Sequence, residues 1–523
     1  MSSDIQNNNT RPPISAAHRV AMNTGILYVK MLLTMGISLY STRLVLNALG
    51  ASDFGIFSLI ASVIAMLSFL KTAMATSTQR FLSYHQGSKD LDMQKKVFTN
   101  SWVLHIAIGL VIILFLLVLQ PFFFGGFLNI PEDRIFVAKT VYYFMLVSVF
   151  FTTISAPFSA TLTARENMLW VAIVNGFGTV LRLFIALSLS YFIQNERLAI
   201  FGLLTAGVSV ASFLLYALVC LKKYPECSVK SYRVDKLLIK ELASFSVWML
   251  FRILTYVGRA QGLAVILNIF YGAVLNAAYG IAHQLSGQLS VLSEIMLKAL
   301  NPQIMKSEGL NDRRRMLRLS MMASKFGFFL VTVIAIPAIF EMPTILGLWL
   351  KNVPPYTDIF CSLILVLIMT SQLTVGLESA IQATGKIRTY QLIVGGILLL
   401  NVPMAYLLLN LSFPPYSILL SAIALELISC AVRLLFVKKV AGLSIKEYTE
   451  KVLLREIIPI LTIILLCWII TNNFLFSFRF LMTGFISTVG FAISIYYVGL
   501  CNDEKLLINN MLKNIKHKIY QSK

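Results

Sequence analysis

Charged side chains are scarce in this chain of 523 residues, because Asp, Glu, Lys and Arg make up only 13% of it, against about 25% in an average soluble domain. Hydrophobic residues make up 58%, and the mean hydropathy is +0.79. The apolar runs last about 20 residues, which is the length that a helix needs to cross a bilayer, whereas the strands of a membrane barrel are about half as long. The sequence therefore predicts an all-α integral membrane protein.

Patterns that carry metal, redox or nucleotide chemistry are also missing. The six cysteines have no CxxC or zinc-like spacing, which excludes a disulfide framework and a metal site. ATGKIR at 383–388 lacks the upstream glycine spacing of a phosphate loop, so no ATP-driven motor is indicated. The D-x-D of KDLD at 89–92 resembles a glycosyltransferase motif, but it stands in a short loop without a nucleotide-binding domain. No cofactor, metal ligand or catalytic residue is predicted, and the chain is not expected to be an enzyme.

The apolar runs predict about fourteen transmembrane helices. An even number places both ends of the chain on the same side of the membrane. The predicted spans are residues 24–48, 53–79, 98–121, 136–163, 168–193, 198–221, 242–270, 273–300, 320–350, 356–383, 388–411, 416–437, 454–473 and 477–500.

Acidic residues are few, since 23 Asp and Glu face 44 Lys and Arg and leave a net charge of +21. About 30 of the cations fall in the termini and in alternate loops, which is the bias of cytoplasmic segments. The segment MKSEGLNDRRRMLR at 305–318 is an example. Topology and attraction to anionic lipid thus explain the charge without nucleic acid. Both termini are predicted to be cytoplasmic, and residues 503–523 are predicted to form an amphipathic helix on the inner membrane surface.

Two joints between predicted helices occur twice. RLVLNALGASDFGIFSL at 43–59 resembles VILNIFYGAVLNAAYGIAHQL at 265–285, and SATLTARENMLWVAIV at 159–174 resembles SAIQATGKIRTYQLIV at 379–394. The same spacing of about 220 residues, here called the repeat spacing, relates both pairs. Two six-helix lobes related by a pseudo-two-fold axis along the membrane normal are predicted. The expected order is a cytoplasmic N-terminal segment (1–23), an N-lobe (24–221), a cytoplasmic linker (222–241), a C-lobe (242–437) and two further spans (454–500).

Arginine occurs where a membrane helix should carry no charge. Arg252 and Arg259 lie two turns apart on one face of their span, and Arg182 lies deep in another. Each costs about 2.5 to 3.5 kcal/mol at a span centre on insertion scales. The carboxylates within spans are too few to neutralise the cations, so a water-filled cavity or an anionic ligand is predicted. Guanidinium groups bind phosphate oxygens bidentately, which makes phosphate or pyrophosphate the natural ligand.

Other polar residues within the spans have two interpretations each. Five cations lie near enough to a span end to reach the interface: Arg43, Lys71, Lys298, Lys325 and Arg433. Glu378 and Glu426 are candidates for coupling-ion sites, with pairing to Lys386 or Arg433 as the alternative. A polar face is formed by His283, Gln284 and Gln288. It would either bind sugar hydroxyls or form helix–helix hydrogen bonds.

The span plan, the two lobes and the joint at 43–57 together resemble the polysaccharide or O-antigen flippases of the multidrug/oligosaccharidyl-lipid/polysaccharide (MOP) exporter superfamily. The shared motifs are Arg43, Gly50, Gly55 and A-T-G-K at 383–386. The resemblance implies a V-shaped transporter that moves undecaprenyl-pyrophosphate-linked oligosaccharide across the bacterial cytoplasmic membrane by alternating access, for O-antigen, capsule or exopolysaccharide synthesis. The candidate cationic cavity for the pyrophosphate comprises Arg252, Arg259, Arg182, Lys30 and Arg43.

The resemblance also sets expectations for partners and energy. The chain is expected to act as a monomer that contacts membrane lipids, its lipid-linked substrate, and a polysaccharide polymerase or chain-length partner. A proton or sodium gradient, or the substrate gradient itself, would supply the energy. The alternatives are a cation-coupled multidrug exporter of the same superfamily, whose cavities favour carboxylates, and a non-transporting protein of envelope synthesis.

Overall fold

The computed structural model describes residues 16–65, 67–128, 130–191, 196–228, 234–350, 352–474, 476, 478–506 and 509. These residues form helices and no strand. Within this part of the chain, eleven helices are long and apolar enough to cross a membrane, or twelve if one bent pair counts as a single span. Helices suit this composition because each satisfies its own backbone hydrogen bonds in lipid. The predicted all-α membrane fold is confirmed.

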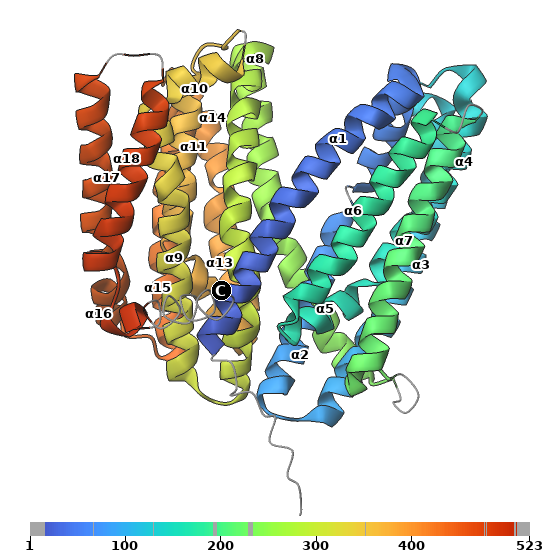
Figure 1. Cartoon of the computed structure of the whole chain (residues 1–523), viewed down its shortest axis with the longest axis horizontal. Coiled ribbons are helices and arrows are strands. Elements are labelled where there is room, and N and C mark those ends of the chain that lie inside the picture. The colour runs from blue at the N-terminus through green and yellow to red at the C-terminus, as the bar shows by residue number, and fades with distance from the viewer. Residues whose placement is uncertain are drawn as a thin grey trace, which may run out of the picture.

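Two lobes stand side by side, approach each other at one end and spread apart toward the other (Figure 1). The N-lobe (residues 16–228) contains α1 (Ala16–Ala65), α2 (Ser68–Gly87), α3 (Leu91–Phe122), η1 (Phe123–Phe127), η2 (Glu132–Arg134), α4 (Ile135–Ile154), α5 (Ala156–Ala164), α6 (Met168–Tyr191), α7 (Arg197–Lys223) and η3 (Pro225–Cys227). The C-lobe (residues 234–441) contains α8 (Lys236–Gly309), α9 (Arg313–Phe340), α10 (Met342–Trp349), α11 (Thr357–Gln372), α12 (Val375–Thr384), α13 (Ile387–Leu399), α14 (Asn401–Asn410) and α15 (Ser417–Ala441).

The last helices are appended to the C-lobe. An apolar cluster that includes Phe329, Ile463 and Phe491 packs them against α9. They lie at the edge of the molecule, beyond α9 and away from the N-lobe (Figure 1). These elements are α16 (Ile445–Tyr448), η4 (Thr449–Leu453), α17 (Leu454–Asn473), α18 (Arg479–Ser494) and η5 (Ile495–Gly499).

The two longest helices each contain one sharp break at a glycine. Gly50 in α1 has φ 78° and Gly272 in α8 has φ 73°, a left-handed region that favours glycine. The Tyr279 hydroxyl donates to the Ala260 carbonyl at 3.3 Å, so α8 folds back on itself at Gly272. The repeat spacing relates the two glycines. Each of these helices thus covers more than one predicted span, which is why fewer continuous helices than fourteen predicted spans are seen; the number of crossings stays a prediction.

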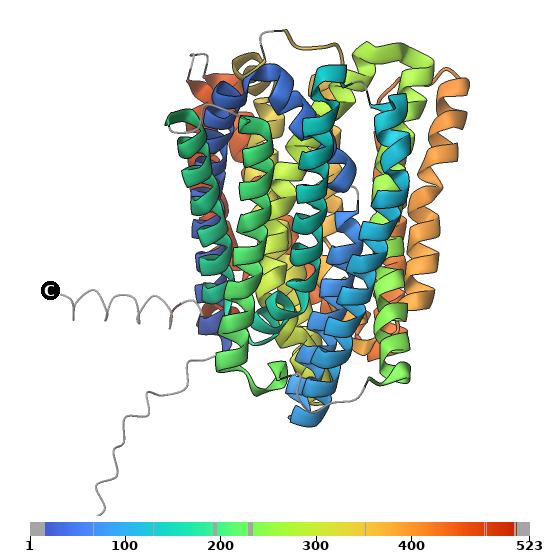
Figure 2. The ribbon, with the colours of Figure 1, turned by 90° about the vertical axis from the view of Figure 1, so that its right-hand side faces the viewer.

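One end of the molecule, here called the basic end, carries the turns rich in Lys and Arg. Side chains of Asp90, Asp235 and Asp312 start α3, α8 and α9 there by accepting backbone N–H bonds from Met93, Leu237 and Arg315 at 2.9 to 3.0 Å. Helices of both lobes run between this end and the opposite one (Figure 2). That the basic end is cytoplasmic stays a prediction. Its cations include Lys222, Lys223, Lys306, Arg313, Arg314, Arg315, Lys438 and Lys439.

Three predicted segments fall partly or wholly outside the described residues. They are most of the N-terminal segment, residues 229–233 of the linker, and the predicted amphipathic helix from residue 510 onward together with 507 and 508. At the start of that last segment, Glu504 is buried and accepts a bond from Lys325 Nζ at 2.5 Å. Lys325, predicted to reach the interface, is instead buried against the C-terminal part of the chain.

Replacing Gly272 with Ala should lower the temperature of thermal unfolding of the purified protein. Nothing lies within 4 Å of the added Cβ, so the cost, about 1 to 2 kcal/mol, comes from the left-handed backbone alone. Gly280→Ala is the matched control, since Gly280 also has open space around it but lies in regular helix. It should unfold no earlier than the parent. Equal unfolding temperatures for the two variants would contradict the account of the turn.

Candidate functional site

A cavity of about 400 Å³ lies within the N-lobe and is here called the N-lobe cavity. Three basic side chains line it: Lys30 of α1, Lys71 of α2 and Arg182 of α6. Lys30 and Lys71 are half-buried, and Arg182 is exposed. Lys298 of α8, across the lobe boundary, is close enough to Lys30 for electrostatic repulsion between the two ammonium groups. The N-lobe cavity therefore brings several positive charges close together.

No carboxylate lines the N-lobe cavity. Within the described part of the chain, Lys30, Lys71 and Arg182 have no Asp or Glu oxygen within 4.0 Å. Buried charges in an apolar surrounding are normally paired, because an unpaired charge loses its hydration without compensation. Such a group of cations is compatible with water in the cavity or with a bound anion.

The remaining wall of the cavity is rich in hydroxyl and amide groups. Thr34 and Thr179 each donate to the carbonyl one turn earlier in their own helix, at 2.8 and 3.1 Å. Their oxygen lone pairs remain available as acceptors for a ligand hydroxyl. Between α4 and α5 the helix is interrupted at Ser155, just before Pro157, and this places Ser155 and Ser159 on the cavity wall. The cavity thus combines cations with neutral groups that hydrogen-bond.

The deep arginines of the C-lobe have a different environment. Arg252 pairs with Glu378, and its Nη2 donates to Glu378 Oε2 at 3.1 Å. Arg259 Nη1 lies 3.5 Å from Glu426 Oε2, and Arg433 Nη2 lies 3.9 Å from Glu426 Oε1. Arg433 also donates to the hydroxyls of Tyr390 and Thr374, at 2.8 and 2.6 Å. We call Arg252, Arg259, Glu378, Glu426 and Arg433 the C-lobe charge cluster.

The C-lobe charge cluster bears on the expected anion site at Arg252 and Arg259, which stays a prediction. Arg252 and Arg259 do project from one helix, but carboxylates from α12 and α15 already engage both. The cavity beside Arg252 measures about 10 Å³, which is room for a single water molecule and not for a headgroup. Glu378 and Glu426 both form ion pairs with arginines. The partner of Glu378 is Arg252 and not Lys386.

The repeat spacing predicted from the sequence allows the cations of the two lobes to be compared. It relates Lys30 in the N-lobe to Arg252 in the C-lobe. At the N-lobe position that corresponds to Glu378 stands Phe158, which carries no charge. The same place in the two lobes therefore holds a cation with a carboxylate partner in one case and a cation without one in the other.

The remaining predicted site residues lie outside the N-lobe cavity and the C-lobe charge cluster. Arg43 is exposed on α1 and lines neither cavity. The His283 ring packs against the Tyr279 ring with centroids 4.5 Å apart, and Gln284 and Gln288 are exposed. Lys71, which sequence reasoning set aside as interfacial, belongs to the cavity. A signal that could have pointed to it is the density of Ser and Thr in a neighbouring span, as in FTTISAPFSATLT at 151–163.

Comparisons with known proteins agree with this fold. The MatE family profile matches residues 27–187. A solved mutant MATE structure superimposes with a TM-score of 0.72 at 13% sequence identity, covering 82% of this chain and 96% of that one. An outward-facing multidrug resistance MATE family transporter of the MOP superfamily gives 0.68 at 14% identity, again over 82% and 96%. A MOP superfamily transporter from Pyrococcus furiosus, described as having a binding pocket whose reverse polarity suggests a different function, gives 0.69 at 14% identity with the same coverage.

No curated protein matches the sequence significantly. The chain has a MATE-like transporter fold, as its structural relatives show. The predicted multi-pass membrane protein is thereby confirmed at the level of the fold.

Glu426→Gln should destabilise the protein, because it leaves Arg259 and Arg433 buried without their shared carboxylate. We expect the free energy of unfolding to fall by about 3 kcal/mol, the scale of breaking a buried ion pair. Denaturant unfolding of the purified protein measures it. Glu450→Gln, which breaks an exposed pair with Lys446 one helical turn away, should change the stability by less than about 0.5 kcal/mol. A Glu426→Gln protein as stable as the parent would show that the cluster is not held by this carboxylate.

Proposed function

We propose that this protein moves a pyrophosphate-linked oligosaccharide lipid, with an undecaprenyl tail, from the inner to the outer leaflet of a bacterial cytoplasmic membrane for surface polysaccharide synthesis. The observation that supports this is the N-lobe cavity, where Lys30, Lys71 and Arg182 meet without a carboxylate. The MATE-like fold supplies the transporter framework. The cavity binds the headgroup while the lipid tail stays in the bilayer.

The chemistry of the cavity matches a pyrophosphate joined to sugar. Pyrophosphate carries several negative charges on closely spaced oxygens, and Arg182 can bind two of them through its guanidinium. Lys30 and Lys71 add point charges from neighbouring helices. The volume of about 400 Å³ lies within the range of about 300 to 1,000 Å³ of small-molecule sites. It accommodates the pyrophosphate and the first sugar, whose hydroxyls meet the Ser, Thr and Asn side chains of the wall.

A multidrug exporter of cationic compounds is the second candidate, because the solved relatives include multidrug transporters. A cationic substrate would be repelled by Lys30, Lys71 and Arg182 in the N-lobe cavity. In the C-lobe, arginines already occupy Glu378 and Glu426. The Pyrococcus furiosus transporter, described as having a pocket of reverse polarity, indicates that pocket polarity differs among proteins with this fold. Pocket polarity is therefore the property on which the two functions should be separated.

Deleting the gene in the host should make the lipid-linked repeat unit accumulate and surface glycan disappear, as measured by mass spectrometry of extracted lipids. Wild-type protein should reverse both effects. The triple variant Lys30→Gln, Lys71→Gln, Arg182→Gln should restore less than about a tenth of the surface glycan, because it removes the whole positive charge of the cavity.

The matched control is Lys222→Gln, Lys236→Gln, Lys240→Gln, which removes the same charge from exposed positions at the basic end. It should complement fully at equal expression. Full complementation by the cavity variant would exclude the cavity as the headgroup site. Normal lipid intermediates in the deletion strain, combined with lost resistance to organic cations, would favour the multidrug exporter. Unchanged lipids and unchanged resistance would favour a non-transporting envelope protein.

A further inference from the structure

Two glycines mark the closest approach of the lobes at the basic end. Gly87 is the last residue of α2 and Gly309 the last residue of α8, and both are buried. A Cβ built on Gly87 would overlap the carbonyl oxygen of Lys306, and one built on Gly309 would overlap the carbonyl oxygen of Tyr84. Neither glycine has a positive φ. The backbone conformation at both positions would therefore accept a residue with a side chain. Glycine is required only because the backbone of the facing helix leaves no room for a Cβ.

The two contacts are copies of each other. The repeat spacing relates Gly87 to Gly309 and also relates Tyr84 to Lys306. Each glycine therefore packs on the carbonyl that lies one turn before the other glycine, in a reciprocal arrangement. Close helix crossings through small residues allow Cα–H···O contacts, which are individually weak. Such a contact stabilises the packing of the two lobes only while α2 and α8 keep this relative position.

Polar side chains from both lobes clasp the same crossing. Arg80 of α2 donates to the carbonyls of Gln382 and Ala383 at the end of α12, at 3.2 and 2.9 Å. In the reverse direction, Gln303 of α8 donates to Glu166, two residues after the end of α5, at 2.5 Å, and Lys306 pairs with the same carboxylate. All of these partners lie across the lobe boundary.

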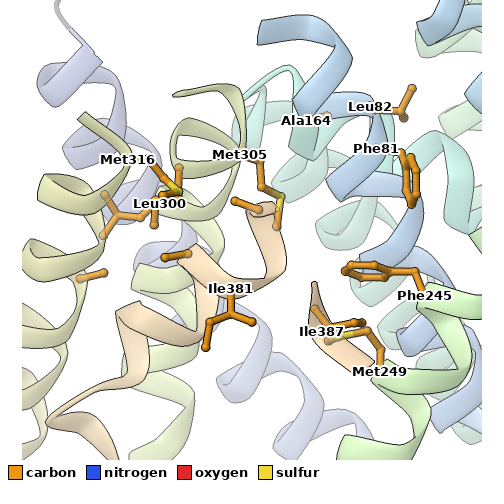
Figure 3. Packing of buried hydrophobic residues seen from close by; sticks show 14 of the residues in the cluster. Phe81, Leu82, Ala164, Phe245, Met249, Leu300, Met305, Met316, Ile381 and Ile387 are labelled. Atoms are coloured by element: carbon orange, nitrogen blue, oxygen red, sulfur yellow. The ribbon is translucent and has the colours of Figure 1, made fainter. Parts of the chain in front are cut away.

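An apolar layer adjoins the clasp. Phe81 of α2 and Phe245 of α8 meet edge to face with ring centroids 6.1 Å apart. They face each other across the boundary, near Met249 of α8 and Ile387 of α13 (Figure 3). Side chains of both lobes thus form one buried cluster at this level.

Several hydrogen bonds join the two lobes. They include the clasp, the Ser77 bond to the Leu242 carbonyl at 3.0 Å, the Tyr28 bond to the Leu292 carbonyl at 2.7 Å, and the Asp235 N–H bond to Asn100 at 2.7 Å. The lobes converge at the basic end (Figure 1), and the clasp surrounds the ends of α2 and α8 there. This conformation is therefore closed between the lobes at the basic end.

We propose that Gly87 and Gly309 form a reciprocal latch, clasped by Arg80 and Glu166, that holds the basic end shut and must separate for the N-lobe cavity to open toward that end. The two glycine contacts are individually weak, so release of the latch depends mainly on the clasp around them, which comprises the two Arg80 bonds and the Lys306–Glu166 pair. Its two-fold form lets both halves separate in one movement. The inference concerns the conformational equilibrium and is independent of the substrate.

The test is the distance between two spin labels, at Ser88 after α2 and at Arg314 in α9, in the full-length protein in lipid nanodiscs. Both positions are exposed on either side of the crossing. In the parent, the short distance of the closed state should dominate. Gly87→Ala with Gly309→Ala should lower the ratio of closed to open molecules by about tenfold or more, because the added methyl groups cannot fit. Gly280→Ala, with open space around it, should leave the distribution unchanged.

An unchanged distribution in the double glycine variant, or an equal shift in the Gly280→Ala control, would overturn the proposal. If the double variant does not insert, Arg80→Met decides the matter. That variant keeps both glycines and removes the two bonds to α12. It should shift the distribution toward the longer distance, and no shift would overturn the latch.

Discussion

A charge within hydrocarbon has to be paired, hydrated or bound to a ligand, and the structure depends on how each lobe meets that constraint. In the C-lobe, α12 and α15 supply carboxylates to the deep arginines, so the cluster is a structural element that ties α8 to its neighbours. In the N-lobe, corresponding positions supply no carboxylate, and the cations face a cavity. The deep arginines of the C-lobe have carboxylate partners, and the cations of the N-lobe cavity have none among the described residues.

This division gives each lobe a distinct part in the proposed cycle. In the C-lobe, ion pairs with Glu378 and Glu426 tie α8 to α12 and α15. The N-lobe presents charge that a headgroup can satisfy, so binding replaces water around Lys30, Lys71 and Arg182. The latch at the basic end then determines from which side the headgroup arrives, because it joins α2 of one lobe to α8 of the other. Substrate recognition and access thus depend on different residues.

The sequence was sufficient for the all-α membrane fold because the signals are local. Apolar runs of about 20 residues identify helices, and the glycine joints at 50 and 272 identify the repeat before any contact is known. It was insufficient for the site because pairing is a tertiary property. Arg252 was predicted to receive the anion, but Glu378, distant in sequence, is its partner. The position of Lys71 near a span end predicts that it reaches the interface. The neighbours that place it in the cavity come from other helices and cannot be read from the sequence. The clasp of Glu166 and Lys306 joins positions 140 residues apart and has no local signature.

The most direct test of the central claim is native mass spectrometry of the protein purified from its host membrane. The wild-type protein should retain an adduct with the mass of the pyrophosphate-linked oligosaccharide lipid. The triple cavity variant with glutamine at positions 30, 71 and 182 should lose it, while the triple surface variant at positions 222, 236 and 240 should keep it. An adduct that persists without the three cavity cations, or a wild-type protein that retains only zwitterionic lipid, would contradict the account.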